Sequence, residues 1–275
     1  MMNLAATKPA SVKPFPLASR VAIVTGSTSG IGLGIARALA AQGAAIMLNG
    51  FGDADEISRT RDALAAETGA SVEYDGADIS RPDQVAEMIE RTARTFGSVD
   101  ILVNNAGVQH VAPIHSFPVD KWESVLSINL SGAFHAIRTA TPGMKARGWG
   151  RIVNVASAHG LVGSPFKSAY VAAKHGILGL TKVAALELAE SGITANAVCP
   201  GYVWTPLVER QISDQARSHG IPREEVIREV LLKKQPNRRF VTVEEIGAVV
   251  AFLCSPGAAS ITGAAIPVDG GWTAE

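Results

Sequence analysis

The sequence of 275 residues has only two cysteines and no block of like charge. Cys199 and Cys254 lie far apart and form neither a CxxC motif nor a metal-type spacing, so we expect free thiols and no bound metal. This cysteine usage is typical of a reducing compartment and predicts a cytoplasmic protein. The 25 lysines and arginines match 25 aspartates and glutamates, which argues against nucleic acid or an anionic membrane as partner.

The chain also lacks a long uninterrupted apolar segment, because Asn, Lys or Gly cuts each apolar run short of a membrane span. Residues 1–17 are broken by three prolines and have no signal-peptide core, so they are predicted to form a flexible arm. This arm has no acidic residue, which leaves organelle targeting as an alternative. We expect one soluble domain over residues 18–275, since 47% hydrophobic residues suffice for its core.

What the chain does have is a regular alternation of short β-branched runs and longer amphipathic runs. Parallel strands that are apolar on both faces need helices above and below them, so the pattern predicts a Rossmann-type doubly wound α/β sheet. Strands are expected at residues 21–26, 44–50, 71–78, 100–107, 150–157 and 192–201. Helices are expected at about 31–42, 54–68, 82–97, 119–145 and 168–190.

Residues from about 205 to 236 interrupt this alternation with two short, charged helical patterns. The segment follows the predicted strand that ends near Pro200, and ligands of open α/β sheets bind beyond the carboxyl ends of the strands. Long connections of this kind usually serve a site, so we expect an inserted helical lid rather than a surface excursion.

The first predicted strand runs into the glycine-rich motif TGSTSGIG at residues 25–32. Gly26, Gly30 and Gly32 allow the backbone to turn tightly and to approach a pyrophosphate at the N-terminus of the next helix. Because the motif lies between a strand and a helix, it predicts dinucleotide binding rather than a purely structural turn. The GK[ST] ending of ATP- and GTP-binding loops is absent.

The end of the second predicted strand bears on the choice between NAD and NADP. A 2′-phosphate needs a cation there, and no Lys or Arg occurs before Arg59, which favours NAD. The acidic residue that usually binds the ribose is also missing, since Asn49, Gly50 and Phe51 stand in its place. Asp53 lies further along, and its alternative role is to begin a helix.

Five features in order resemble the short-chain dehydrogenase/reductase family over nearly the whole chain: TGSTSGIG, NNAG at 104–107, Ser157, the YxxxK spacing of Tyr170 and Lys174, and PG at 200–201. A phenol is a poor base at neutral pH, because its pKa is about 10, unless a cation stabilises the phenolate. Lys174 lies one helical turn from Tyr170 and would supply that charge. Tyr170 is therefore predicted to exchange a proton with the substrate hydroxyl during hydride transfer.

The family resemblance implies further roles. Ser157 would hydrogen-bond the substrate oxygen, and Asn129 would hold a water that links Lys174 to solvent. It also implies a homotetramer, in which the two long helices pair and the final strand forms a second contact. The implied NAD contacts are Gly26, Thr28, Ser29, Gly30, Ile31, Gly32, Phe51, Asp78, Ile79, Asn105, Ala106, Gly107, Tyr170, Lys174, Pro200, Gly201, Val203 and Thr205.

Polar residues cluster around the predicted hydride-transfer centre: Gln109 follows NNAG, His159 follows Ser157, and Lys167 precedes Tyr170 by one turn. A cation with amide and imidazole donors suits a small carboxylate better than a steroid or a long acyl chain. Stretches such as NNAGVQHVAPI, TPLVERQI and DGGWTAE resemble the D-3-hydroxybutyrate dehydrogenase branch of the family. That resemblance implies oxidation of (R)-3-hydroxybutyrate to acetoacetate with NAD. The implied substrate contacts are Gln109, Ser157, His159, Lys167, Tyr170, Tyr202, Gln211 and Trp272.

Three alternatives stay open at this point. Tyr202 stands where the branch usually has tryptophan, and Phe166 also departs from it, so longer 3-hydroxy acids fit the sequence as well. A 3-oxoacyl thioester reductase is a second enzyme class, although it usually prefers NADP. A catalytically idle NAD-binding protein is the third, and the intact Ser157, Tyr170 and Lys174 argue against it.

Overall fold

A computed structural model describes residues 16–205, 208–209, 212–213, 216 and 220–274. Its centre is one seven-stranded sheet in the order β3-β2-β1-β4-β5-β6-β7, and every pairing is parallel. The chain order reverses between β1 and β4, which is where doubly wound sheets bind ligands. The strands are β1 (Val21–Val24), β2 (Ala45–Asn49), β3 (Val72–Asp75), β4 (Ile101–Asn104), β5 (Gly150–Val155), β6 (Ile193–Pro200) and β7 (Ala265–Val268).

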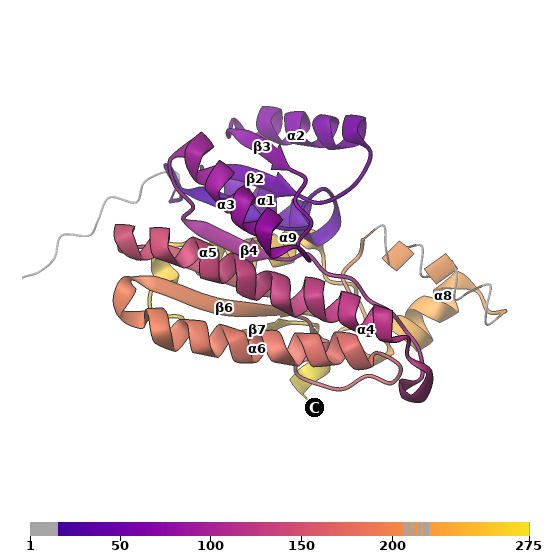
Figure 1. The fold of residues 1–275 in the computed structure, drawn as a ribbon. Helices are drawn as coiled ribbons and strands as arrows, with labels where there is room; N and C mark the ends of the chain where they lie inside the picture. Colours follow the sequence, from indigo (N-terminus) through magenta and orange to yellow (C-terminus); the bar gives the residue numbers. More distant parts are fainter. Residues whose placement is uncertain (1–15, 206–207, 210–211, 214–215, 217–219, 275) are drawn as a thin grey trace, which may run out of the picture.

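Helices cover both faces of the sheet, with α3, α5 and α6 on one face and α1 and α9 on the other (Figure 1). Each face has its own apolar core, because a strand buried on both sides needs packing partners above and below. Leu39 and Ile246 lie in one core, and Met88 and Met144 in the other. The helices are α1 (Gly30–Ala41), α2 (Ala54–Thr68), α3 (Pro82–Phe96), α4 (Val119–Leu126), α5 (Gly132–Arg147), α6 (Ser168–Leu188), α8 (Arg223–Glu225) and α9 (Val243–Cys254).

The predicted doubly wound sheet is confirmed, and the predicted elements agree with the observed ones to within a few residues. The single helix expected over residues 119–145 is wrong in one respect, since a π-helical turn at Ser127–Ser131 separates α4 from α5. Asn129 in this turn receives a hydrogen bond from the N–H of Val108 and donates one to its carbonyl. The turn thereby braces the loop that follows β4. Within the described residues, no helix combines the length and apolar character that a membrane crossing requires.

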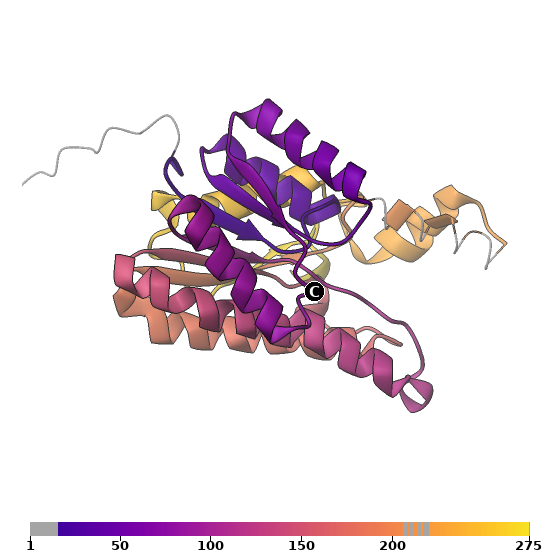
Figure 2. The same ribbon diagram turned by 45° about the horizontal axis from the view of Figure 1, so that its top comes forward.

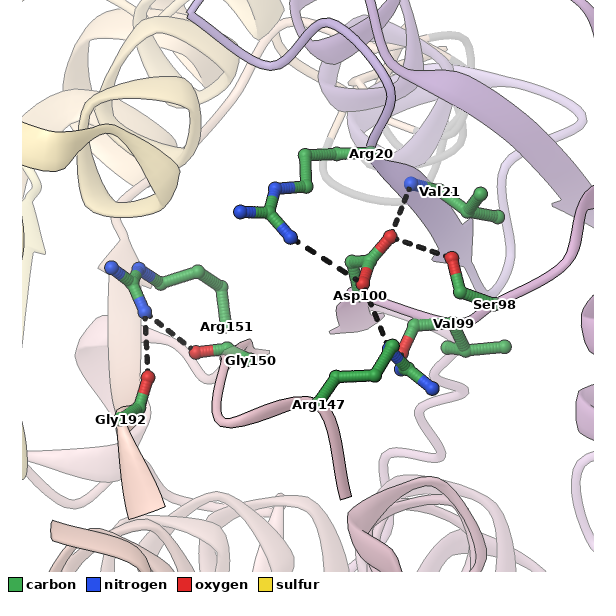
Figure 3. Close-up of polar contacts among 9 residues, drawn as sticks. All are labelled: Arg20, Val21, Ser98, Val99, Asp100, Arg147, Gly150, Arg151 and Gly192. Atoms are coloured by element: carbon green, nitrogen blue, oxygen red, sulfur yellow. Dashed lines mark hydrogen bonds and ion pairs between the residues drawn. The ribbon is translucent and has the colours of Figure 1, made fainter. Parts of the chain in front are cut away.

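A polar network closes the amino-terminal edge of the sheet (Figure 3). The buried carboxylate of Asp100, just before β4, accepts hydrogen bonds from the N–H of Val21 at 3.1 Å and from the hydroxyl of Ser98 at 2.7 Å. Its other oxygen lies 3.3 Å from Nε of Arg147 and 3.7 Å from Nη1 of Arg20. These contacts fix the entry to β1 and β4 and leave the opposite, carboxyl edge free for a site.

The insert between β6 and α9 projects beyond the carboxyl ends of the strands, as both ribbon views show (Figure 2). It has a small apolar core of its own, in which Ile212, Val226 and Leu231 are buried and Tyr202 packs against them. After α8 the chain continues through a π-helical turn, Val226–Leu231, and a 3-10 turn, Leu232–Lys234. Predicted residue Gln211 lies outside the described residues.

Candidate active site

The glycine-rich turn after β1 is packed too closely to hold side chains. Gly26 and Gly30 have φ angles of +62° and +56°, in the left-handed region that favours glycine. A Cβ on Gly32 would lie 2.2 Å from the carbonyl oxygen of Gly26, and the Asn105 amide ties the turn to β4 through two 2.9 Å hydrogen bonds. Ser29 makes no side-chain cap at the start of α1, whose first turn has no acidic residue. The helix N-terminus is therefore free to bind an anion, which fits a dinucleotide pyrophosphate.

The end of β2 offers little for a charged group. The side chain of Asn49 is fully buried, because its amide donates to the carbonyls of Asp75 and Ala77 and its oxygen accepts from the N–H of Gly26. Phe51 is 67% exposed beside the turn. Asp53 caps α2 through the N–H groups of residues 55 and 56, which confirms its structural role.

A cavity of about 260 Å³ opens at the carboxyl ends of β4, β5 and β6. All predicted substrate residues that the structure describes line this cavity, and so does half of the predicted cofactor set. The lining predicted residues are Ile31, Asn105, Gly107, Gln109, Ser157, His159, Lys167, Tyr170, Lys174, Pro200, Gly201, Tyr202, Val203, Thr205 and Trp272. The sequence missed Val108, Val155, Ala156 and Val208, whose apolar side chains carry no distinctive signal.

The remaining predicted residues lie outside the cavity lining. Asp78 accepts hydrogen bonds from the N–H and hydroxyl of Ser80, and Ile79 packs against Gly132, where a Cβ would lie 2.4 Å from it. These contacts give both residues a structural task in the turn after β3. The others are Gly26, Thr28, Ser29, Gly30, Gly32, Phe51, Ala106 and Asn129.

Ser157, Tyr170 and Lys174 meet where β5 ends against α6. Lys174 is buried and its Nζ donates to the carbonyl of Val155 at 2.7 Å. The same nitrogen lies 5.5 Å from the centre of the Tyr170 ring. The hydroxyl of Ser157 accepts from the N–H of His159 at 3.1 Å, which fixes its position at the strand end. A hydroxyl, a phenol and an amine therefore face one cavity.

Burial is the largest cause of the pKa shifts of Tyr170 and Lys174. Burial raises the pKa of Tyr170 above its usual value of 10.0, while its hydrogen bond with Ser157 acts in the opposite direction. Burial also lowers the pKa of Lys174 to about 8. Lys174 is not among the causes that shift the Tyr170 pKa in the protein alone. The predicted stabilisation of the phenolate by Lys174 together with the nicotinamide ring stays a prediction.

The substrate side of the cavity combines one cation with an aromatic wall. Lys167 is the N-cap residue directly before α6, and burial and the charge of Lys234 lower its pKa. Burial, then Lys167 and Lys234, lower the pKa of His159 to about 4, so this imidazole is neutral near pH 7. Its ring meets Trp272 edge-on at 5.0 Å, and Tyr202 stacks on the indole at 5.5 Å. Such a wall suits a small ligand with one anionic end.

Gln235 contacts the residues of this wall, and the sequence predicted no role for it. The side chain is fully buried; its oxygen accepts a hydrogen bond from the N–H of Tyr202 and its amide donates to the carbonyl of Arg239 at 2.7 Å. A Cβ on Gly201 would lie 2.5 Å from that oxygen, so the glycine is needed for the contact. Gln235 therefore positions Tyr202 although 33 residues separate them.

The fold and the site together define a dinucleotide-binding oxidoreductase of the α/β class. A family model described as enoyl-(acyl carrier protein) reductase matches residues 26–273. The chain belongs to the short-chain dehydrogenase/reductase family, whose dehydrogenases use nicotinamide cofactors.

Two curated relatives share the name D-beta-hydroxybutyrate dehydrogenase. The protein of Rhizobium meliloti (strain 1021) is 57% identical over 257 residues, which cover 94% of this chain and 100% of the relative. That of Cupriavidus necator is 55% identical over 259 residues, with the same coverage. Among solved structures, levodione reductase superposes with a TM-score of 0.86 at 35% identity and covers 94% of this chain and 99% of its own.

Proposed function

We propose that the protein catalyses the reversible, NAD-dependent oxidation of (R)-3-hydroxybutyrate to acetoacetate. The observation that carries this proposal is one cavity that Ser157, Tyr170 and Lys174 line together with a half-buried Lys167 and an aromatic wall. The names of the two relatives that are 57% and 55% identical support the same substrate. We also propose a cytoplasmic location, which the free, buried thiols of Cys199 and Cys254 support.

NAD is the proposed cofactor because the end of β2 has no basic side chain for a 2′-phosphate between Asn49 and Asp53. The N-terminus of α1 would hold the pyrophosphate, and the residues around Pro200 and Thr205 would flank the nicotinamide. When bound, NAD accepts the hydride from the alcohol carbon.

The chain's own residues handle the proton. The hydroxyl of Ser157 holds the substrate oxygen, and Tyr170 takes the hydroxyl proton as the C–H bond breaks, then returns it in the reduction of acetoacetate. Lys174 stabilises the phenolate that forms. A small cavity of about 10 Å³, lined by Asn129 and Lys174, has room for one water through which the proton leaves.

The substrate carboxylate binds Lys167, with the neutral imidazole of His159 and the amide of Gln109 as further hydrogen-bond partners. Trp272 and Tyr202 contact the methyl end. We also propose that the insert acts as a lid that excludes water before hydride transfer, and that Gln211, which lies outside the described residues, is a further carboxylate contact.

The test is an absorbance assay at 340 nm with purified protein, NAD or NADP, both enantiomers of 3-hydroxybutyrate, its longer homologues and a 3-oxoacyl thioester. Lys167→Ala removes a charge-assisted hydrogen bond of about 1.5–3 kcal/mol, so KM for 3-hydroxybutyrate should rise roughly 10- to 150-fold. Lys182→Ala is the matched control, because Lys182 is an exposed lysine of the same helix. An unchanged KM in Lys167→Ala, or preference for the thioester, would refute the proposal.

We further propose a homotetramer. Phe134 on α5 and Val183 and Leu186 on α6 are exposed apolar side chains, and Leu186 is 82% exposed. Phe134 and Val183 also line a cavity of about 430 Å³ between the two helices. β7 is an edge strand of the sheet, which leaves it available for a second contact.

A further inference from the structure

A 3-10 turn near the end of the insert brings a second lysine close to the substrate side of the cavity. Lys234 ends the turn Leu232–Lys234, and its Nζ lies 5.7 Å from the centre of the Trp272 ring. That indole is in edge-on contact with His159 and stacked on Tyr202, both of which line the cavity. Lys234 is therefore in contact with the wall that the substrate is proposed to touch.

The backbone at this position is held although the side chain is exposed. Gln235, the next residue, is fully buried and bonded to Tyr202 and to Arg239. Lys233, the residue before, is equally exposed but makes no comparable contact with an aromatic ring of the described chain. The two neighbouring lysines thus differ in placement, and only Lys234 is directed at the pocket wall.

The charge of Lys234 acts on the cavity. Burial is the main cause of the lowered pKa values of His159 and Lys167, and the charge of Lys234 lowers both further. Within the part of the chain that the structure describes, no aspartate or glutamate lines the cavity, and the ion pairs include neither Lys234 nor Lys167. Lys167 in the lining and Lys234 beside Trp272 thus have no ion-pair partner among the described residues, and both make this part of the cavity electropositive.

We propose that Lys234 is an outer cation that attracts the substrate carboxylate toward Lys167. A substrate must therefore carry a carboxylate to be turned over efficiently. This inference rests on the proposed function. Charges of one sign at a cleft raise the local concentration and association rate of an oppositely charged ligand, and rim charges act mainly through the association rate and its salt dependence. Lys234 therefore favours hydroxy acids over neutral alcohols of the same shape.

The experiment compares Lys234→Met, Lys234→Arg and the matched control Lys233→Met in the intact chain. With saturating NAD at low salt, kcat/KM for (R)-3-hydroxybutyrate should fall roughly 10-fold in Lys234→Met, the low end of electrostatic steering, and stay near the wild-type value in the other two. The decrease of kcat/KM with added salt should be smaller in Lys234→Met than in wild type. For the neutral methyl ester, Lys234→Met and wild type should agree within about twofold.

A second readout does not depend on turnover. The His159 pKa, followed by NMR titration without substrate, should rise from about 4 in Lys234→Met and stay unchanged in Lys233→Met. The inference would be overturned if kcat/KM depended on salt equally in Lys234→Met and wild type, or if Lys234→Met lost as much kcat/KM for the ester as for the acid. In either case, normal turnover of 3-hydroxybutyrate by the wild type would leave the proposed function intact. Failure of the wild type to oxidise 3-hydroxybutyrate would instead refute the proposed function itself.

Discussion

Replacing Asp100 should weaken the fold without altering catalysis, because this carboxylate closes the sheet edge opposite the cavity. In Asp100→Ala the buried N–H of Val21 loses its side-chain acceptor, which costs about 1–3 kcal/mol. Arg20 and Arg147 are 34% and 35% exposed and can turn to water, so each lost pair adds only about 0–1 kcal/mol. The free energy of unfolding should therefore fall by roughly 2–4 kcal/mol.

Asp100→Asn gives a graded comparison. Its amide oxygen can still accept from Val21, so only the charged contacts are lost and the destabilisation should be about 1–2 kcal/mol. Asp62→Asn is the control, since Asp62 forms an exposed pair with Arg61 and should change stability by less than about 0.5 kcal/mol.

Urea unfolding at one protein concentration measures these differences, and an unchanged m-value shows that the transition is comparable. In buffer, kcat and KM should equal those of the wild type. The reasoning would be refuted by an Asp100→Ala protein as stable as wild type, or by an Asp100→Asn protein less stable than Asp100→Ala. A large change in KM of a fully folded Asp100 variant would refute the claim that this network stabilises the fold without affecting the cavity at the opposite edge of the sheet.

Three further predictions concern the cofactor, the buried lysine and the assembly. Gly32→Ala should abolish NADH binding measured by fluorescence, because its Cβ would lie 2.2 Å from the carbonyl oxygen of Gly26, whereas Gly179→Ala, with open space around it, should bind normally. Lys174→Met should lose activity yet gain up to about 3 kcal/mol of stability at pH 7, since burial lowers the lysine pKa from 10.5 to about 8. In the unfolded chain the lysine keeps its proton up to pH 10.5, so the stability of the wild type rises between about pH 8 and 10.5. The stability advantage of Lys174→Met should therefore shrink over this range. Urea unfolding at several pH values measures it, and a constant advantage would contradict the prediction. Leu186→Glu should reduce the molar mass in light scattering, and an unchanged mass would exclude the surface around Leu186 as a contact.

The apolar runs located most of the sheet because its central strands are buried on both faces. β6 is the clearest case, since all eight of its residues are buried. The sequence analysis did not predict β7, because this strand lies at the edge of the sheet and most of its residues are only partly buried. It did not predict α9 either, although Thr242 and Glu245 form a capping box that marks the start of this helix.

The catalytic group could be predicted because its spacing is local: Tyr170 and Lys174 lie one turn apart on α6. Gln235 and Lys234 could not, because they reach Tyr202 and Trp272 only when the chain returns from the insert. The burial of Tyr170, which raises its pKa in the protein alone, could not be predicted for a related reason. A sequence shows which charges are neighbours, but it does not show how deeply a phenol is buried or which carbonyl a lysine prefers.

The anchoring of Gln235 to Tyr202 divides the insert into parts with separate tasks. The hydrogen bond from the N–H of Tyr202 to Gln235 ties the end of the insert to the aromatic wall, so this part of the cavity is fixed from both sides of the insert. Substitutions in the outer part would then change how fast ligands come and go, whereas substitutions at the anchor would change which ligands fit. Selectivity and turnover speed can accordingly be altered one at a time, by evolution or by an engineer.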